Sequence, residues 1–359
     1  MTRRIRRGLS RRRFITGTGA AAVGITLLPY RARGQEEEKR VNFYNWDTYI
    51  GETTLEDFRE ETGIEVTLDI FADTDEMFAK LREGNPGYDV IVPSNDYVER
   101  MRVADMLVPL DHDKIPNIAN IDPLFMDPAF DPGRQYSLPY MWGTIGIGYS
   151  TDRVPETPDS WKVLYDSDEL SGRISLLAEA RTVLGIGMKY LGHSFNSTEA
   201  AHITEVTELL IQQKPHIKVF ADDNGQDLLA SGEVDLCQEW NGDIGQLMTE
   251  DDTVTYLVPQ EGSMLFEDDL AIPVGAPHPE NAHAFINYIF DAEPGAAIAD
   301  YIQYATPNKA AREFLGEDYN NNPSIFPPED IIAKCESQLY RGEEALRLFD
   351  EAWTRIQSA

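Results

Sequence analysis

The sequence predicts an α/β protein with two lobes, and three observations lead to this class. Strand and helix patterns alternate from residue 40 to residue 92, as expected for a parallel sheet with helices on both faces. The extended stretch 140–149 contains three glycines and suits a segment that crosses between lobes. The alternation then restarts from residue 173, which predicts a second α/β lobe.

Local signals define the elements expected in the first lobe. Thr53 and Glu56 have the spacing of a capping box, which predicts that a helix begins at residue 54, and Gly63 is a typical stop signal. Apolar residues that alternate with polar ones predict the strands. The expected order is strand 40–44, helix 54–61, strand 65–71, helix 75–82 and strand 88–92.

The second half of the chain continues in the same way. The strand at 265–272 is expected to be a return crossing to the first lobe. The expected elements are strand 173–177, helices 183–191 and 197–213, a short helix 228–232, strands 234–239, 255–258 and 265–272, and helices 279–290, 294–301, 329–335 and 343–356.

The charge of the chain excludes some partners. The 359 residues include 62 acidic and 31 basic side chains, for a net charge of −31. Nine of the basic residues precede residue 35, so that the rest of the chain carries 22 basic and 62 acidic residues, or −40. Nucleic acids and anionic membranes need a positive surface, so neither is an expected partner. A cationic ligand is compatible with this charge, although solubility in salt is a sufficient reason for it.

The first 34 residues are expected to be an export signal rather than part of the fold. Arginines fill the start, an apolar stretch covers 14–29, and cleavage is expected near Gly34. Residues 10–15, Ser-Arg-Arg-Arg-Phe-Ile, match the twin-arginine pattern. No cysteine lies directly after the apolar stretch, where a lipid anchor would be attached. We therefore expect a periplasmic protein without a lipid anchor.

Two loops at strand ends suggest a binding site for a cation. Trp46, Asp47 and Tyr49 follow the first strand, and Ser94 and Asp96 follow the third. Ligands of open α/β sheets bind at such strand ends, aromatic faces attract ammonium groups, and a carboxylate offsets the desolvation of the charge. Packing of the rings on a lobe surface is the alternative for the first loop alone, but two such loops on one sheet edge favour the wall of a cleft.

The second lobe repeats this chemistry, because Glu179 and Trp240 also follow predicted strands. Asp268 and Asp269 are adjacent within the strand expected to form the return crossing. Because side chains alternate along a strand, only one of the two can face a cleft. The alternative is that both are surface acids.

The sequence contains no recognisable group of catalytic residues. We therefore expect that the protein is not an enzyme and binds no cofactor. The chain has no Gly-x-Ser-x-Gly elbow. His278 and His283 lack the spacing of a helical metal site, so both are expected at the surface. Cys237 and Cys335 define no disulfide framework and are not expected to pair, and no metal site is predicted.

Six short motifs occur in a fixed order along residues 40–345. They are Asn45-Trp46-x-x-Tyr49, Val92-Pro93-Ser94, Leu138-Pro139-Tyr140-x-Trp142-Gly143, Trp240-Asn241-Gly242, Asp268-x-Leu270-Ala271-Ile272-Pro273 and Tyr304-x-Thr306-Pro307-Asn308-x-Ala310-Ala311-Arg312. Each motif is short, but the ordered set resembles the periplasmic spermidine/putrescine-binding proteins of ABC importers.

The resemblance implies a hinged, type II-like periplasmic-binding fold with two or more crossovers between its lobes. After the signal peptide at 1–34, lobe 1 would comprise 35–145 plus 267–314, and lobe 2 would comprise 146–266 plus 315–359. It implies a monomer that captures a polyamine in the cleft and delivers it to an ABC permease. The alternative is a polyamine-sensing subunit that signals to a membrane receptor.

The resemblance also implies roles for individual residues. The aromatic walls would be Trp46, Tyr49, Trp240, Phe266 and Tyr304. The acidic partners of the amino groups would be Glu179 and Asp268, with Ser94 and Gln338 as neutral hydrogen-bonding groups. Thr182 replaces an acid of some relatives, whereas Asp47, Asp96 and Asp222 add acids where Thr, Tyr or Ser occur, which alters the number and spacing of the charges.

Overall fold

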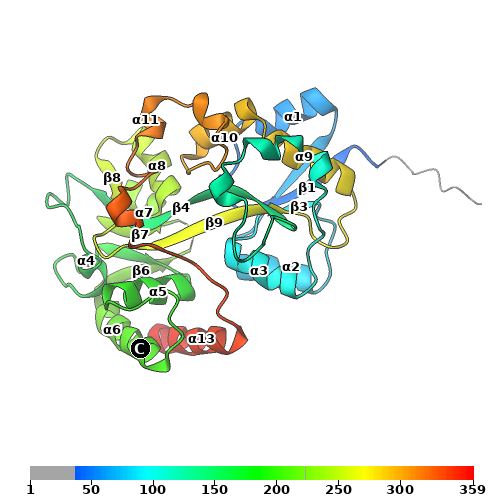
Figure 1. The fold of residues 1–359 in the computed structure, drawn as a ribbon. Coiled ribbons are helices and arrows are strands. Elements are labelled where there is room, and N and C mark those ends of the chain that lie inside the picture. The colour runs from blue at the N-terminus through cyan, green and yellow to red at the C-terminus, as the bar shows by residue number, and fades with distance from the viewer. Residues whose placement is uncertain (1–36, 223) are drawn as a thin grey trace, which may run out of the picture. The chain divides into compact units, whose positions relative to one another are not determined.

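The computed structural model describes residues 37–222 and 224–359 (Figure 1). They belong to one compact unit, Glu37–Ala359, of mixed α and β structure. The expected export signal lies outside the described residues. The strands are β1 (Arg40–Asn45), β2 (Glu65–Ile70), β3 (Val90–Ile91), β4 (Ser137–Ser150), β5 (Ile174–Leu177), β6 (Ile217–Ala221), β7 (Leu236–Trp240), β8 (Val254–Leu257), β9 (Met264–Ala271) and β10 (Glu336–Ser337).

Helices lie between most of these strands. The α-helices are α1 (Thr54–Thr62), α2 (Thr74–Arg82), α3 (Asn95–Val103), α4 (Lys162–Tyr165), α5 (Ala180–Tyr190), α6 (Ala200–Gln213), α7 (Gly225–Ala230), α8 (Asn241–Glu250), α9 (Pro279–Ile289), α10 (Ala292–Ile302), α11 (Glu317–Asn320), α12 (Glu329–Ile332) and α13 (Glu343–Ser358). Short 3-10 turns lie at His112–Lys114, Pro116–Asn120, Pro123–Phe125, Lys214–His216 and Ala311–Glu313.

The sheet is mixed and continuous, with the order β2-β1-β3-β9-β4-β7-β5-β6. The expected parallel pairing holds at its two ends, where β1 pairs with β2 and β3, and β5 pairs with β6 and β7. Between them, β4 and β9 pair antiparallel with each other and with their neighbours on either side. The antiparallel pairing of β4 with β9 was not predicted; these two long strands, which include the stretches expected to cross between lobes, belong to both halves of the sheet (Figure 1).

Strand β4 changes partner within the glycine-rich stretch. Residues 137–144 pair with β9, whereas residues 145–150 pair with β7 and β8. A side chain at Gly143 would overlap Asn241 and crowd the Phe266 ring. This close approach is the physical reason for a glycine at the point where β4 passes from one half of the sheet to the other.

Most predicted elements are present, with shifts of a few residues at their ends. The prediction of a capping box was wrong, because the Thr53 hydroxyl donates to the Asp57 carboxylate and does not accept from a backbone N–H group. Gly63 does end α1 in the left-handed conformation, with φ of 72°. The polar segment after β3 was predicted as a loop, but α3 begins there at Asn95. Strand β6 and helix α8 were not predicted.

The C-terminal helix packs against α5 and α6 (Figure 1). Ala345, Phe349, Ala352 and Ile356 are buried, and their spacing places them along one face of α13. This packing fixes the position of the segment before the helix, which includes Gln338.

Strand β9 presents different acids to its two sides. Glu267 and Asp269 both pair with the fully buried guanidinium of Arg134, which lies 2.7 Å from Asp269. Asp268 points the other way, as expected from the alternation of a strand. The alternative that Asp268 and Asp269 are surface acids is wrong, because they are 7% and 0% exposed.

The prediction that His283 lies at the surface was also wrong. Its side chain is buried on α9, where Nε2 accepts from the backbone N–H of Asp111 at 3.0 Å. His278 is partly buried and pairs with Asp89 at 3.0 Å. Cys237 and Cys335 are free thiols.

We predict that Arg134→Met lowers the free energy of unfolding by about 3–5 kcal/mol, because it leaves the buried carboxyl group of Asp269 and the partly buried one of Glu267 without their cation. Urea denaturation of the ligand-free protein measures this loss. Arg59→Met is the control, since Arg59 forms an exposed pair with Glu56 on α1 and should cost less than about 1 kcal/mol. Equal losses in the two variants would contradict the role given to Arg134.

Candidate functional site

Ten of the twelve residues predicted for the site line one cavity. The cavity contains about 590 Å³ of space free of protein atoms, part of it open to solvent. The predicted residues that line it are Trp46, Asp47, Tyr49, Ser94, Glu179, Trp240, Phe266, Asp268, Tyr304 and Gln338.

The other two predicted residues lie elsewhere. Asp96 is buried beside the cavity and forms an ion pair with Arg181 at 2.6 Å. Asp222 lines a smaller neighbouring cavity, which shares Glu179 and Trp240 with the main one. The structure therefore does not bring these two acids into the main cavity.

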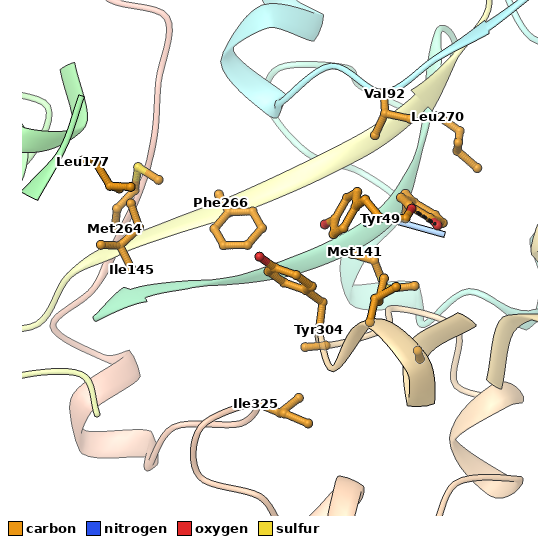
Figure 2. Close-up of a cluster of buried hydrophobic side chains, with 14 of the residues drawn as sticks. Tyr49, Val92, Met141, Ile145, Leu177, Met264, Phe266, Leu270, Tyr304 and Ile325 are labelled. Carbon is orange, nitrogen blue, oxygen red and sulfur yellow. Dashed lines mark hydrogen bonds between the residues drawn. The ribbon is translucent and has the colours of Figure 1, made fainter. Parts of the chain in front are cut away.

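Aromatic rings line the cavity, and Figure 2 shows the rings of Tyr49, Phe266 and Tyr304 close to one another. The ring of Phe266 on β9 meets Trp240 edge to face, with centroids 4.9 Å apart, and meets Tyr304 at 5.8 Å. Tyr304 in turn meets Tyr49 at 5.0 Å. These edge-to-face contacts restrict the positions of the rings relative to one another.

A glycine allows this packing. A side chain at Gly242 would overlap the ring of Tyr304. Gly242 lies in the first turn of α8, two residues after Trp240. The Trp-Asn-Gly motif therefore supplies one ring of the cavity, that of Trp240. Its glycine leaves room at the start of the helix for a second ring, that of Tyr304.

Asp268 is the acid at one end of the cavity. It accepts a hydrogen bond from the Tyr49 hydroxyl at 3.0 Å. Burial raises the pKa of Asp268 to about 8, against the effect of the Tyr49 hydrogen bond, and the charge of Glu179 raises it further. A carboxyl group with this pKa favours its neutral form until a cation comes close.

Asp243 is a second acid of the cavity, and the sequence analysis missed it. Tyr304 donates to it at 3.0 Å, and burial raises its pKa to about 7, with a further contribution from the charge of Asp47. The sequence does contain a signal for this residue, because Asp243 directly follows the Trp-Asn-Gly motif and lies in the first turn of a helix. Without a predicted α8, nothing indicated its direction.

Arg181, Thr74 and Met264 also line the cavity and were not predicted. Arg181 lies two residues after Glu179, in the first turn of α5. Thr182, noted as a replacement for an acid, donates to Glu179 at 3.0 Å. It orients that carboxylate instead of adding a charge.

The arrangement suits a cation that also has apolar parts. Asp268 with Glu179, and Asp243 with Asp47, are two acidic groups on a cavity whose walls are aromatic. Ammonium groups can pair with these acids, while methylene groups contact the rings. The described residues contain no cluster of three or more His, Cys, Asp or Glu side chains suited to a metal ion.

The comparisons with known proteins decide the family. The model of the bacterial extracellular solute-binding protein family matches residues 53–327. The chain belongs to this family. It is 33% identical to the putrescine-binding periplasmic protein PotF of Escherichia coli, over 90% of this chain and 92% of that protein. It is also 33% identical to the spermidine/putrescine-binding periplasmic protein of Salmonella typhimurium, over 96% of this chain and 98% of the relative.

A solved structure supports the fold of this family member. The putative spermidine/putrescine ABC transporter protein of Listeria monocytogenes superposes with a TM-score of 0.85 at 33% identity, over 89% of this chain and 99% of that one. The structural neighbours are two-lobe periplasmic binding proteins, which confirms the predicted fold class. Within the described residues, no helix combines the length and apolar character needed to cross a membrane.

The raised pKa of Asp268 predicts a pH-dependent stability. The unfolded carboxyl group ionises near its ordinary pKa of 3.8, whereas the folded group holds its proton up to about pH 8. Between these values the unfolded state binds fewer protons, so the stability due to this group is full below about pH 4 and is lost as pH rises to about 8.

We therefore expect Asp268→Asn to stabilise the ligand-free protein more at pH 8 than at pH 4. Urea denaturation across this range measures the difference, and the slope should change by at most about 1.4 kcal/mol per pH unit. Asp152→Asn, on an exposed turn, is the control. If the wild type and Asp268→Asn depend on pH in the same way, Asp268 is not the buried acid described above.

Proposed function

We propose that this protein captures a polyamine of the spermidine/putrescine class in its cavity and delivers it to an ABC permease. One observation carries the proposal: two acidic groups, centred on Asp268 and Asp243, lie on a cavity lined by aromatic rings. A polyamine has ammonium groups separated by methylene chains, which match the acids and the rings respectively. The names of the relatives from Escherichia coli and Salmonella typhimurium point to the same ligand class.

The division into two lobes supports a capture mechanism. We assign 35–145 plus 267–314 to lobe 1 and 146–266 plus 315–359 to lobe 2, with β4 and β9 as crossing strands. Asp268 then belongs to lobe 1 and Asp243 to lobe 2. A ligand that pairs with both acids binds most tightly when the lobes are close together, so binding favours closure.

The cellular setting follows from the family and from the first residues of the chain. Export through the twin-arginine pathway, cleavage near Gly34 and a periplasmic, monomeric protein are part of the proposal. We assign no catalytic role, because the acids of the cavity are matched to a cation and not to a nucleophile or a scissile bond. No observation favours the alternative of a sensing subunit.

The binding prediction concerns Asp268. Asp268→Asn keeps the shape of the side chain but leaves a buried ammonium group without its counter-charge, so the affinity for spermidine or putrescine should fall roughly a hundredfold to several thousandfold. Calorimetric titration measures the change. Asp269→Asn is not a suitable control because Asp269 pairs with Arg134, so the exposed Asp152→Asn replaces it. A loss of less than about fivefold in Asp268→Asn would remove Asp268 from the ligand site.

The kinetic prediction concerns salt. A net charge of −40 beyond residue 34 attracts a polycation over long distances, and salt screens this attraction. Contacts inside the cavity are screened much less. Stopped-flow measurements should therefore show that added salt lowers the association rate of spermidine more than it raises the dissociation rate. The opposite pattern would mean that the surface charge does not guide the ligand.

A further inference from the structure

Asp96 is a buried carboxylate whose two oxygens are both occupied by protein groups. One oxygen accepts from Arg181 at 2.6 Å and from Gln338 at 2.9 Å. The other accepts from Ser94 at 2.9 Å. The residue is 2% exposed. These contacts leave little of Asp96 to bind a ligand, although its position in the sequence predicted that role.

The partners of Asp96 come from different parts of the chain. Asp96 lies in the first turn of α3, within the proposed lobe 1. Arg181, in the first turn of α5, and Gln338, directly after β10, lie within the proposed lobe 2. The carboxylate of one lobe is therefore held by donors of the other.

A second cation of lobe 2 lies close to this contact. The guanidinium nitrogens of Arg341 are buried and have no hydrogen-bond partner among the described residues. The group lies near the rings of Phe195 and Phe349, and the charge of Asp96 acts on it. Together, Arg181, Gln338 and Arg341 form what we call the cationic socket.

Neighbouring hydrogen bonds and ion pairs also join the region of α3 to the proposed lobe 2. Arg181 also donates to the Tyr97 hydroxyl at 3.0 Å. Asn95 donates to the backbone carbonyl of Gln338. Arg100 of α3 pairs with Glu343 of α13 at 3.1 Å. The start of α3 is thus bonded to the proposed lobe 2 by several groups, and of its two ion pairs the one between Asp96 and Arg181 contains the more deeply buried carboxylate.

We propose that Asp96 is a positioning residue that docks into the cationic socket when the lobes close, and that this contact, not a contact with the ligand, slows ligand release. The inference rests on the proposed function and goes beyond it. Because Glu179 precedes Arg181 by two residues at the start of α5, and both line the cavity, docking of Arg181 also restricts the position of Glu179. Removing one partner of a buried charged pair acts mainly on dissociation.

The test is a set of variants with putrescine and spermidine as probes. Asp96→Asn and Arg181→Met should each raise the dissociation rate about tenfold or more, with less than about a twofold change in the association rate. The dissociation rate of the double variant should be no higher than that of the faster single variant, because both substitutions remove the same contact. Arg181→Lys, which keeps the charge, should restore part of the slow release.

Arg173→Met is the matched control. Arg173 pairs with Asp235, and both lie within the proposed lobe 2, so the variant loses a similar ion pair that does not join the lobes. Its dissociation rate should equal that of the wild type. An unchanged dissociation rate in Asp96→Asn, or an altered preference between putrescine and spermidine, would overturn the proposal.

X-ray scattering of the ligand-free proteins separates this inference from the proposed function. Because the docked contact is made by protein groups alone, we expect it to hold the lobes together without a ligand as well. Asp96→Asn and Arg181→Met should therefore have a larger radius of gyration than the wild type, and Arg173→Met should not. This result stands even if the wild type binds neither polyamine. Equal radii in all four proteins would overturn the inference while leaving the capture of polyamines intact.

Discussion

The balance of charge across strand β9 is the constraint on which the site depends. Three acids follow one another on this strand, and alternation sends Glu267 and Asp269 to the side where Arg134 neutralises them. Asp268 faces the cavity, where no lysine or arginine of the described residues forms an ion pair with it. The protein therefore supplies the cation on one side of the strand and leaves the other side to a ligand.

The same strand shows how much of the structure could be predicted. Alternation along β9 and the resemblance of its motif were enough to choose Asp268 over Asp269, because the period of a strand is a local property. The aromatic residues of the cavity were likewise predicted, since each lies in or near one of the motifs that carry the resemblance. The pairing of β4 and β9 could not be predicted, because register between distant segments depends on the whole sheet.

The parts that were missed have physical causes. Helix α8 contains Gly242 and Gly245, which weaken its helical pattern, so Asp243 had no predicted element to orient it. Asp96 was assigned to the ligand by its place in the sequence, yet the position of a residue does not reveal which cation will meet it. Arg181 supplies that cation from a segment far along the chain. The contacts of Asp96 with Arg181, Gln338 and Ser94 occupy both of its oxygens.

The central claim is that the cavity acids give up protons to make ion pairs with an ammonium ligand. Calorimetric titration of putrescine in buffers of different ionisation enthalpy tests this claim directly. Burial raises the pKa of Asp268 to about 8 and that of Asp243 to about 7, and a nearby cation must lower both. The account predicts net proton release on binding between about pH 6 and pH 7, which disappears well above pH 8. Binding without proton release in that range, or with proton uptake, would contradict it.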